Sequence, residues 1–543
     1  MITAHREGRV GADAGGQTVT SRRRWWFDPT IVAPIATAVV YLVVLALRLP
    51  SALSTFYSYS DFPEALRLGD AVFHGGWGHG LAVPSQSGVG PLWVVGLLDQ
   101  IAGSEIPGML FGAFIVALAI GFMVLTARRV LGTTSAVAVG ALCVGAPAVV
   151  AWEMLTPVGH ESTLLLTAVL AWQLVALSQI RPRHATKTSL AVGALAGICI
   201  TSDSLVVVAA VVPWIICGLI LLRHHPERRV RLIITAGVAA ASAVAIELLS
   251  SAVGIVGRGG VAFSPSLDGI TAGLRTTALT LGQMISGAWY RDALPASLIT
   301  AAVVAFVAVL YLAGRNVTLG DGRADPRRKI YVWFWLLSAA GLVAGLCFSG
   351  LGIQHSPVNY QGHYVDALWF ALAAVLPIAV LRRGLLPRIA PVGISCLILV
   401  NAVGIARMSA SLFDGPDYPD AARLTATLNH LGISHGYGGY WESYAIGWDT
   451  NQRITALPLQ QCTHGSGAPT LCRYEFAAPA WYSVQPGPVF VIAVRGACHD
   501  DLCIDSESLR SLPPPEEIRA VGLLQVYVYA HDTFADLPMA THP

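Results

Sequence analysis

Two carboxylates follow the first long apolar segment of this sequence. Asp61 and Glu64 lie in the stretch Tyr57–Glu64, with Pro63 between them. A carboxylate at such a place can serve as a general base toward a hydroxyl group. An acid followed three residues later by Glu, with Pro in the first turn, is also a helix start signal that resembles a capping box. Both roles for Asp61, catalytic base and helix cap, are open at this point.

The composition places these residues in a membrane protein. Hydrophobic residues make up 54% of the 543 residues and charged residues only 12%, which excludes an ordinary soluble protein. Segments near the ~20 residues that cross a bilayer predict eleven spans, at 31–49, 108–126, 135–152, 162–179, 189–201, 205–222, 232–253, 296–313, 331–348, 365–381 and 391–408. No P-loop, G-x-S-x-G motif or internal repeat occurs.

The basic residues predict how these spans are oriented. With the N-terminus in the cytoplasm, most arginines lie in inner loops, and the outer loops hold Arg48, Arg67, Arg258, Arg275 and Arg291. Basic residues favour cytoplasmic loops, and no signal-peptide cleavage site is apparent. We therefore expect a multi-pass plasma-membrane protein with a cytoplasmic tail (1–30), a transmembrane domain (31–408) with an outer loop at 50–107, and an extracytoplasmic domain (409–543).

The last 135 or so positions read as a folded α/β domain. Residues 417–431 have the pattern of an amphipathic helix, and 438–444 that of a turn entering a helix. The segments 452–458, 488–494 and 523–529 are strand-like, and an acidic, Pro-rich stretch surrounds 513–517. The predicted fold class is thus a polytopic α-helical membrane protein with a C-terminal extracytoplasmic α/β domain.

Further acids lie at the outer ends of the predicted spans. Asp70 belongs to the first outer loop, and Glu153, Glu161 and Asp203 follow or begin spans. Acids at helix ends commonly act as caps, so a structural role is open for each of them. His74 and His79 could bind a metal ion together with Asp70, although such histidines more often form local hydrogen bonds or face head groups.

Positively charged residues on the outer side are exceptions to the preference of basic residues for the cytoplasmic side. Arg275 and Arg291 lie in the outer loop 254–295, where an anionic phosphate ligand would explain them. Contact with lipid head groups explains them as well. Glu247 is the clear ionisable residue inside a span, which makes it a functional candidate, although a hydrogen bond to a neighbouring helix would suffice.

The cysteines divide between the spans and the C-terminal domain. Cys462, Cys472, Cys498 and Cys503 form an even set on the side where disulfides persist. Four cysteines allow three pairings, and our hypothesis is Cys462–Cys472 and Cys498–Cys503, because each pair is close along the chain. A zinc site is the competing interpretation, but neither pair has Cys-x-x-Cys spacing.

Several short motifs resemble one family of membrane enzymes. The chain resembles GT-C glycosyltransferases of the protein O-mannosyltransferase and aminoarabinose-transferase branches. The resemblance lies in the acid Asp61 after an N-in first span, in Gly88–Leu92 with Phe111–Phe114, in His363–Tyr364 before a late span, and in Tyr440–Tyr444. Two positions depart from that family. Ser-Asp-Phe-Pro-Glu replaces the common Asp-Glu pair, and His363 stands where the family often has Arg.

The resemblance implies transfer of a sugar from a polyprenyl-phosphate donor to an envelope acceptor (glycan, lipid or protein) at the outer membrane face. It implies Asp61 as the base. It also implies that Glu64, Asp70 and Glu161 position the acceptor or, as in some relatives, a divalent cation. On the donor-phosphate side it implies Arg275, Arg291, His363 and Tyr364. Expected partners are the donor, the acceptor and membrane lipids, with no nucleic acid.

Two other functions compete with this one. A lipid or glycolipid transporter is disfavoured because ionisable groups within spans are scarce and inverted repeats are not evident. A non-catalytic protein of GT-C type that acts in envelope assembly is the second. The sequence itself calls for no cofactor.

Overall fold

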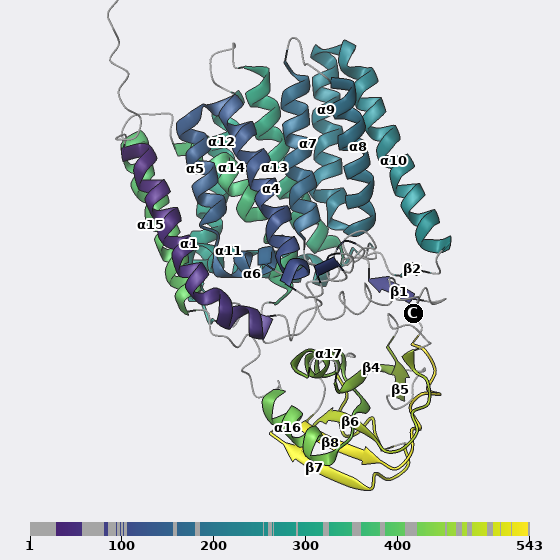
Figure 1. Ribbon diagram of the computed structural model, residues 1–543. Helices are drawn as coiled ribbons and strands as arrows, with labels where there is room; N and C mark the ends of the chain where they lie inside the picture. The colour runs from purple at the N-terminus through teal and green to yellow at the C-terminus, as the bar shows by residue number, and fades with distance from the viewer. Residues whose placement is uncertain are drawn as a thin grey trace, which may run out of the picture.

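A computed structural model describes most of the chain. The described residues are 29–56, 81–84, 106–155, 160–179, 185–252, 255–258, 265–288, 292–318, 325–349, 360–380, 386–407, 421–450, 453–462, 470–474, 481–496, 503–510, 512–522 and 524–540, with single positions between 94 and 102 and at 263. A layer of long helices stands beside a smaller sheet domain (Figure 1). The predicted combination of a polytopic helical domain and a C-terminal sheet domain is confirmed.

The helical domain contains long apolar helices, as the hydropathy pattern predicts, but fewer of span length than the predicted eleven are found among the described residues. Among the described residues, nine helices are long and apolar enough to cross a membrane, and Thr133–Val144 and Glu161–Leu177 are shorter apolar helices. The count of eleven spans is therefore not confirmed. The elements of this domain are α1 (Pro29–Phe56), α4 (Ile106–Leu131), α5 (Thr133–Val144), α6 (Ala148–Leu155), α7 (Glu161–Leu177), α8 (Ala185–Ser202), η2 (Val207–Val211), α9 (Val212–His224), η3 (Pro226–Arg228), α10 (Arg229–Ala252), α11 (Leu267–Ser286), α12 (Ala296–Thr318), α13 (Pro326–Ser349), η5 (Tyr360–Val365), α14 (Leu368–Val380) and α15 (Leu386–Arg407), with a two-stranded parallel ladder of β1 (Leu81–Pro84) and β2 (Ile255–Arg258).

The third predicted span, at 135–152, is not one helix. Helix α5 ends at Val144, and α6 begins at Ala148. Pro147 lies in the break, and a proline interrupts a helix because it lacks the backbone N–H and its ring crowds the preceding turn. Figure 1 shows α6 near the end of the helical layer that faces the sheet domain. This break redirects the chain before it reaches the candidate site.

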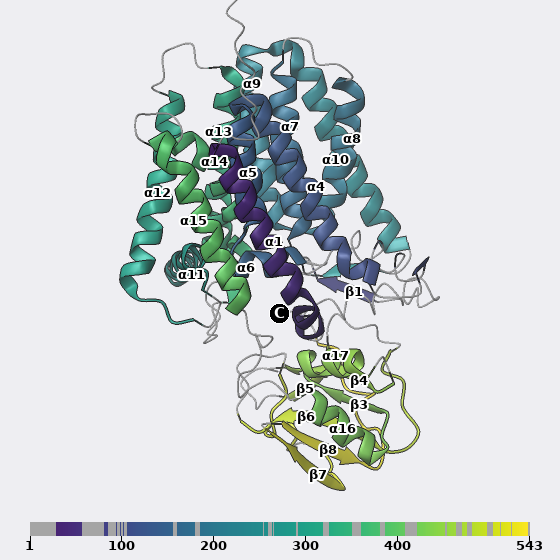
Figure 2. The ribbon, with the colours of Figure 1, turned by 60° about the vertical axis from the view of Figure 1, so that its left-hand side comes forward.

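The predicted outer loop 254–295 contains a helix that the hydropathy pattern did not reveal. Helix α11 (Leu267–Ser286) is preceded by the cap residue Ser266, whose hydroxyl accepts a hydrogen bond from the Gly269 N–H at 2.9 Å, and is followed by Gly287, which adopts φ 65°. In Figure 2 this helix is seen nearly end-on while its neighbours stand upright, so it lies across them. Its buried side is rich in Gly and Thr, which let it pack closely on the spans.

Glycine pairs bring two sets of spans into close contact. Gly193 and Gly197 of α8 face Thr235, Ala239 and Ser242 of α10 with no room for a Cβ atom, as in the small-xxx-small packing of membrane helices. Gly341 of α13 faces the backbone of Val208 in the same way, and a Cβ atom at Gly345 would lie 3.1 Å from the Val208 side chain. Val208 belongs to η2, a π-helical turn whose extra residue precedes Pro213. Pro213 cannot donate a backbone hydrogen bond, which accounts for the wider turn there.

The sheet domain has six strands in the order β5-β4-β3-β6-β8-β7. Its elements are α16 (Ala421–Leu431), β3 (His435–Gly438), α17 (Tyr440–Asp449), β4 (Thr455–Cys462), β5 (Thr470–Arg473), β6 (Val489–Val494), β7 (Glu517–Val521) and β8 (Leu524–Tyr529). Strand β3 pairs in parallel with β4 and β6, and the remaining pairs are antiparallel. The helices at 417–431 and after 438, and the three predicted strands, correspond to α16, α17, β4, β6 and β8.

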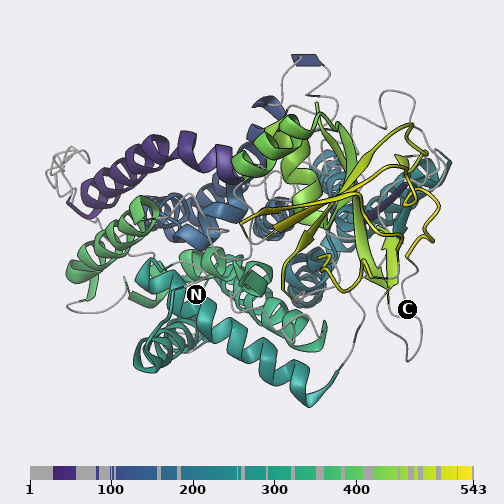
Figure 3. The same cartoon turned by 90° about the horizontal axis from the view of Figure 1, so that it is seen from below.

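The two domains meet on one side of the helical layer. Figures 1 and 2 show the sheet domain at the end where α6 and α11 lie. Seen from that end, it leaves α1 uncovered (Figure 3). Trp481 packs against the hydrophobic core of the helical domain and also against that of the sheet domain. A disulfide joins Cys462 to Cys472 across the β4–β5 hairpin, with their Cα atoms 5.9 Å apart.

Candidate active site

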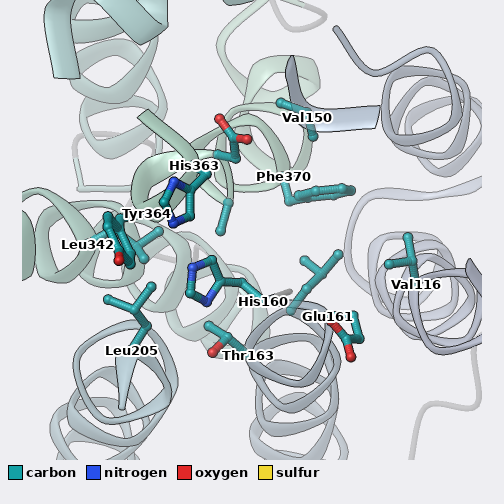
Figure 4. Close-up of a pocket in the computed structure, with 13 residues that line it drawn as sticks. Val116, Val150, His160, Glu161, Thr163, Leu205, Leu342, His363, Tyr364 and Phe370 are labelled. Atoms are coloured by element: carbon teal, nitrogen blue, oxygen red, sulfur yellow. The ribbon is translucent and has the colours of Figure 1, made fainter. Parts of the chain in front are cut away.

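Three segments that are far apart in the sequence converge on the side of the helical domain that faces the sheet domain. His160 directly precedes α7, and Asp203 directly follows α8. His363 and Tyr364 belong to η5, which packs against α11 and α13. Figure 4 shows the side chains of His160, His363 and Tyr364 turned toward one another. Since they come from different segments, the packing of the spans holds the site together.

The carboxylate of Asp203 is the centre of a buried hydrogen-bond network. Its Oδ2 atom lies 2.9 Å from Nδ1 of His160 and accepts a hydrogen bond from the Thr163 hydroxyl. Its Oδ1 atom accepts the Leu205 N–H at 2.8 Å. The side chain is 1% exposed. A buried carboxylate is stable only when it is paired and hydrogen-bonded, and Asp203 meets both conditions.

The protonation of Asp203 follows from these contacts. The residue lies between the spans Ala185–Ser202 and Val207–His224. Burial by itself raises the pKa of this carboxyl group, but the charge of His160 and the hydrogen bonds just described outweigh burial, and the pKa lies below its ordinary value. Asp203 is therefore an ionised hydrogen-bond acceptor, and the Nδ1 atom of His160 is the donor.

The imidazole of His160 forms part of an aromatic cluster. It stacks on His363 with ring centroids 5.6 Å apart and an interplanar angle of 10°. The ring of Tyr364 lies 5.5 Å from His160 and 3.9 Å from His363. The His160 side chain is 11% exposed, and residues His363 and Tyr364 are 9% and 8% exposed. Buried imidazole and phenol groups of this kind are suited to binding an oxyanion.

This cluster lines a pocket at the junction of several helices. The pocket-lining residues are Val116, Val150, His160, Glu161, Thr163, Leu164, Leu205, Leu342, His363, Tyr364, Asp366, Ala367 and Phe370. Glu161 is 3% exposed, and in Figure 4 its carboxylate points away from the two imidazoles. Thr163 and the buried Asp366 also belong to the lining. The remaining walls are apolar, so polar groups act here at low dielectric, where electrostatic interactions are stronger than in water.

A larger, mostly apolar cavity adjoins the pocket. It has a volume of about 220 Å³ and lies between the end of α13, the turn before η2 and Phe263. Leu205 and Tyr364 line both spaces. Phe263 contacts Phe348 with ring centroids 5.8 Å apart. A ligand with a polar head and an apolar chain would match the two spaces together.

The structure brings only some of the predicted site residues together. Glu161, His363 and Tyr364 line the pocket. Arg275 does not: the Gly- and Thr-rich side of α11 is buried, and Arg275 lies on the exposed side. Asp61, Glu64, Asp70, Arg291 and Cys498 lie outside the described residues. Cys503 is disulfide-bonded.

Metal binding was also expected for part of this set. Within the described ranges, no three His, Cys, Asp or Glu side chains are grouped so that they could hold a metal ion. The candidate ligands Glu64 and Asp70 lie outside those ranges. The binding of a divalent cation therefore stays a prediction.

Sequence reasoning did not assign His160 and Asp203 to the site. Each sits at a helix end, where a polar residue is ordinarily explained as a cap, and they are 43 residues apart. The one sequence signal that could have linked them is that both lie on the same predicted side of the membrane. The packing of α7 against α8, which no short motif encodes, places them in contact.

Comparison with known structures identifies the architecture. ArnT from Cupriavidus metallidurans, in a crystal structure with bound undecaprenyl phosphate, aligns with a TM-score of 0.54 at 13% identity, over 93% of this chain and 99% of that chain. This is the GT-C fold. The apo structure of the same ArnT aligns with a TM-score of 0.50 at 13% identity, over 92% of this chain and 99% of that one.

The solved structure of a second protein is similar over a smaller part of the chain. The oligosaccharyltransferase of Archaeoglobus fulgidus aligns with a TM-score of 0.45 at 10% identity, over 78% of this chain and 62% of that chain. No protein-family model matches the sequence, and no curated protein matches it either. The GT-C fold expected from the short motifs is thus confirmed at the level of structure.

Proposed function

We propose that this protein transfers a sugar from a polyprenyl-phosphate-linked donor to a cell-envelope acceptor at the outer face of the plasma membrane. The observation that carries the proposal is that two spaces of different polarity lie next to each other. A polar pocket with His160, His363 and Tyr364 adjoins a mostly apolar cavity, and Leu205 and Tyr364 line both. A phosphate bound to an isoprenoid chain has the matching polarity at each end.

The fold supports the same proposal. ArnT, whose crystal structure contains undecaprenyl phosphate, aligns over nearly the whole of both chains. A shared fold does not fix the reaction, because one fold hosts many functions. The two adjoining spaces of this chain therefore carry the proposal together with the fold.

The proposed reaction assigns roles to the predicted residues. The acceptor hydroxyl oxygen attacks the anomeric carbon of the sugar while the bond from that carbon to the phosphate oxygen breaks. The electron pair leaves with polyprenyl phosphate, and the hydroxyl proton passes to the Asp61 carboxylate. His363 and Tyr364 face the departing phosphate. Glu161 positions the acceptor, together with Glu64 and Asp70.

Orientation in the membrane is part of the proposal. Arg128 and Arg129 at the end of α4, and Arg223 at the end of α9, lie at helix ends opposite the sheet domain. Basic residues favour the cytoplasmic side. We therefore propose that the pocket and the C-terminal domain (409–543) are extracytoplasmic and that the tail at 1–30 is cytoplasmic.

The test is a transfer assay with purified protein, radiolabelled polyprenyl-phosphate sugars and cell-envelope extract. We expect label to enter the extract with one or a few of the donors. Asp61→Asn should abolish transfer and leave folding nearly intact, because Asn caps a helix about as well as Asp. Asp268→Asn is the matched control, since Asp268 is an exposed acid in the first turn of α11.

Each outcome has a definite meaning. Near-normal transfer by well-folded Asp61→Asn protein would show that Asp61 is not the base and would favour its role as a helix cap. Absence of transfer with every donor, together with movement of labelled lipid across proteoliposome membranes, would favour a transporter. Absence of both activities would favour a non-catalytic role in envelope assembly.

A further inference from the structure

We propose that Asp203 and His160 form a positioning relay that holds the ring of His363 against the phosphate of the lipid donor. The inference rests on the proposed function, in which His363 contacts that phosphate. Neither Asp203 nor His160 has to touch the ligand for the relay to work. Asp203 fixes His160 by hydrogen bonding, and His160 fixes His363 by stacking.

The first step of the relay is the anchoring of Asp203. Its two oxygens are held from different directions by the Thr163 hydroxyl and the Leu205 backbone N–H. Thr163 belongs to the first turn of α7, and Leu205 follows the end of α8. The carboxylate is thus tied to two helices at once, and its position is set by their packing.

The second step is the orientation of His160. Its Nδ1 atom lies 2.9 Å from Oδ2 of Asp203, which fixes the rotation of the ring about its Cβ–Cγ bond. The His160 side chain is 11% exposed, and Asp203 is 1% exposed. A hydrogen bond to a buried, ionised carboxylate is among the stronger ones in proteins. His160 therefore offers a fixed face to its neighbour.

The third step is the contact with His363. The two imidazoles lie 10° from parallel, and Tyr364 packs against both rings. Figure 4 shows His160 next to His363 at the wall of the pocket. His363 belongs to a short 3-10 turn, which constrains its backbone less than a long helix would. The stacked ring of His160 adds a constraint on the orientation of the His363 ring.

The relay also explains how a histidine serves where the GT-C family often has arginine. An arginine brings a rigid, planar fork of donors to a phosphate. An imidazole has two nitrogens, so its usefulness depends on ring orientation. A stacked neighbour that is itself held by a carboxylate provides that orientation.

The experiment measures how much the phosphate contributes to lipid binding. Dissociation constants for undecaprenyl phosphate and for undecaprenol are determined with the full-length protein in detergent. The undecaprenol constant divided by the undecaprenyl phosphate constant, called the phosphate ratio, measures the contribution of the phosphate. His160→Ala should lower this ratio about 2- to 10-fold, as expected for the loss of one aromatic pair. His160→Phe keeps a stacking ring but loses the hydrogen bond to Asp203, so it should restore part of the ratio and not all of it. Undecaprenol binding should stay constant in both variants.

Other results would overturn the relay. Equal weakening of both lipids by His160→Ala would show a general structural role. Equal losses in the Ala and Phe variants would show that a ring nitrogen, and not stacking, matters. A wild-type protein that binds the two lipids equally would contradict the proposed function itself, which is a distinguishable result.

Two milder variants keep the test decisive if His160→Ala does not fold. Thr163→Val removes one hydrogen bond to Asp203, and Asp203→Asn removes its charge while retaining a group that accepts the Leu205 N–H. Both should lower the phosphate ratio in the same direction as His160→Ala. An unchanged ratio in both folded variants would overturn the relay.

Discussion

The hydroxyl of Tyr41 donates a 2.6 Å hydrogen bond to the backbone carbonyl of Ala146, 105 residues away in the sequence. That carbonyl lies in the break between α5 and α6, next to Pro147. The Gly145 carbonyl accepts a bond from Asn401 of α15, and the Leu142 carbonyl accepts one from Trp369 of α14. Side chains from three other helices thus satisfy backbone groups that the break leaves without helical partners, as irregular backbone within a membrane requires.

The first prediction tests this arrangement with Tyr41→Phe. The variant removes one hydroxyl and leaves the buried Ala146 carbonyl without its donor, which costs about 1–3 kcal/mol. We expect a lower apparent melting temperature in detergent. Tyr311→Phe is the matched control, because Tyr311 is 63% exposed on α12. Equal melting temperatures for both variants would contradict the role given to Tyr41.

The second prediction concerns the contact between Gly341 and the π-helical turn η2. A Cβ atom at position 341 would overlap the Val208 carbonyl oxygen. Gly341→Ala should therefore displace η2, with a cost of about 1–3 kcal/mol from overpacking. Because Leu205 and Asp203 lead into this turn, undecaprenyl phosphate binding should weaken as well.

A glycine with open surroundings provides the control for this prediction. At Gly237 of α10, a Cβ atom would have no neighbouring atom within 4 Å. Gly237→Ala should leave binding unchanged and raise helix stability by about 1 kcal/mol at most. If Gly341→Ala behaves like Gly237→Ala in both melting and binding, the close contact does not support the site.

The third prediction concerns the disulfide of the sheet domain. Cys462 and Cys472 are separated by ten positions and close the β4–β5 hairpin. On loop-closure entropy the bond contributes about 2–3 kcal/mol. Mass spectrometry of peptides from non-reduced protein should find Cys462 linked to Cys472 and Cys503 linked to Cys498. Four free thiols in protein prepared without reductant would contradict the bonds and weaken the case for an extracytoplasmic domain.

The sequence was most informative where hydrophobicity dominates. Strands β6 and β8 begin and end within a residue of their predicted bounds, because both are apolar and buried. Strand β7 was not predicted. The acidic, Pro-rich stretch at 513–517 reaches only its first residue, and this edge strand buries Val521 alone, while Ile518 and Ala520 are exposed. Pro147 was visible in the sequence, but the apolar residues around it concealed the break.

The site was harder to predict than the fold. Helix α11 is amphipathic and lies across the spans, so a search for span-length apolar segments passes over it. His160 and Asp203 meet only because α7 and α8 pack together. Glu247, a candidate because it lies within a span, is on an exposed side of α10 between Val244 and Leu248. Tertiary contacts therefore decide which polar residues form a site.

The last prediction concerns the orientation of the two domains in the membrane. Helix α12 runs away from the sheet domain, and α13 begins at the opposite side of the helical layer (Figure 2). The end of α12 carries Arg315, and the start of α13 carries Arg327, Arg328 and Lys329. The loop after Arg323 should therefore be cytoplasmic and residues 409–543 extracytoplasmic. A fluorescent-protein fusion should report the first, and an alkaline-phosphatase fusion the second. Two fusions on the same side would contradict the fold, whereas opposite sides in the reverse order would contradict only the charge argument and would move the pocket to the cytoplasm.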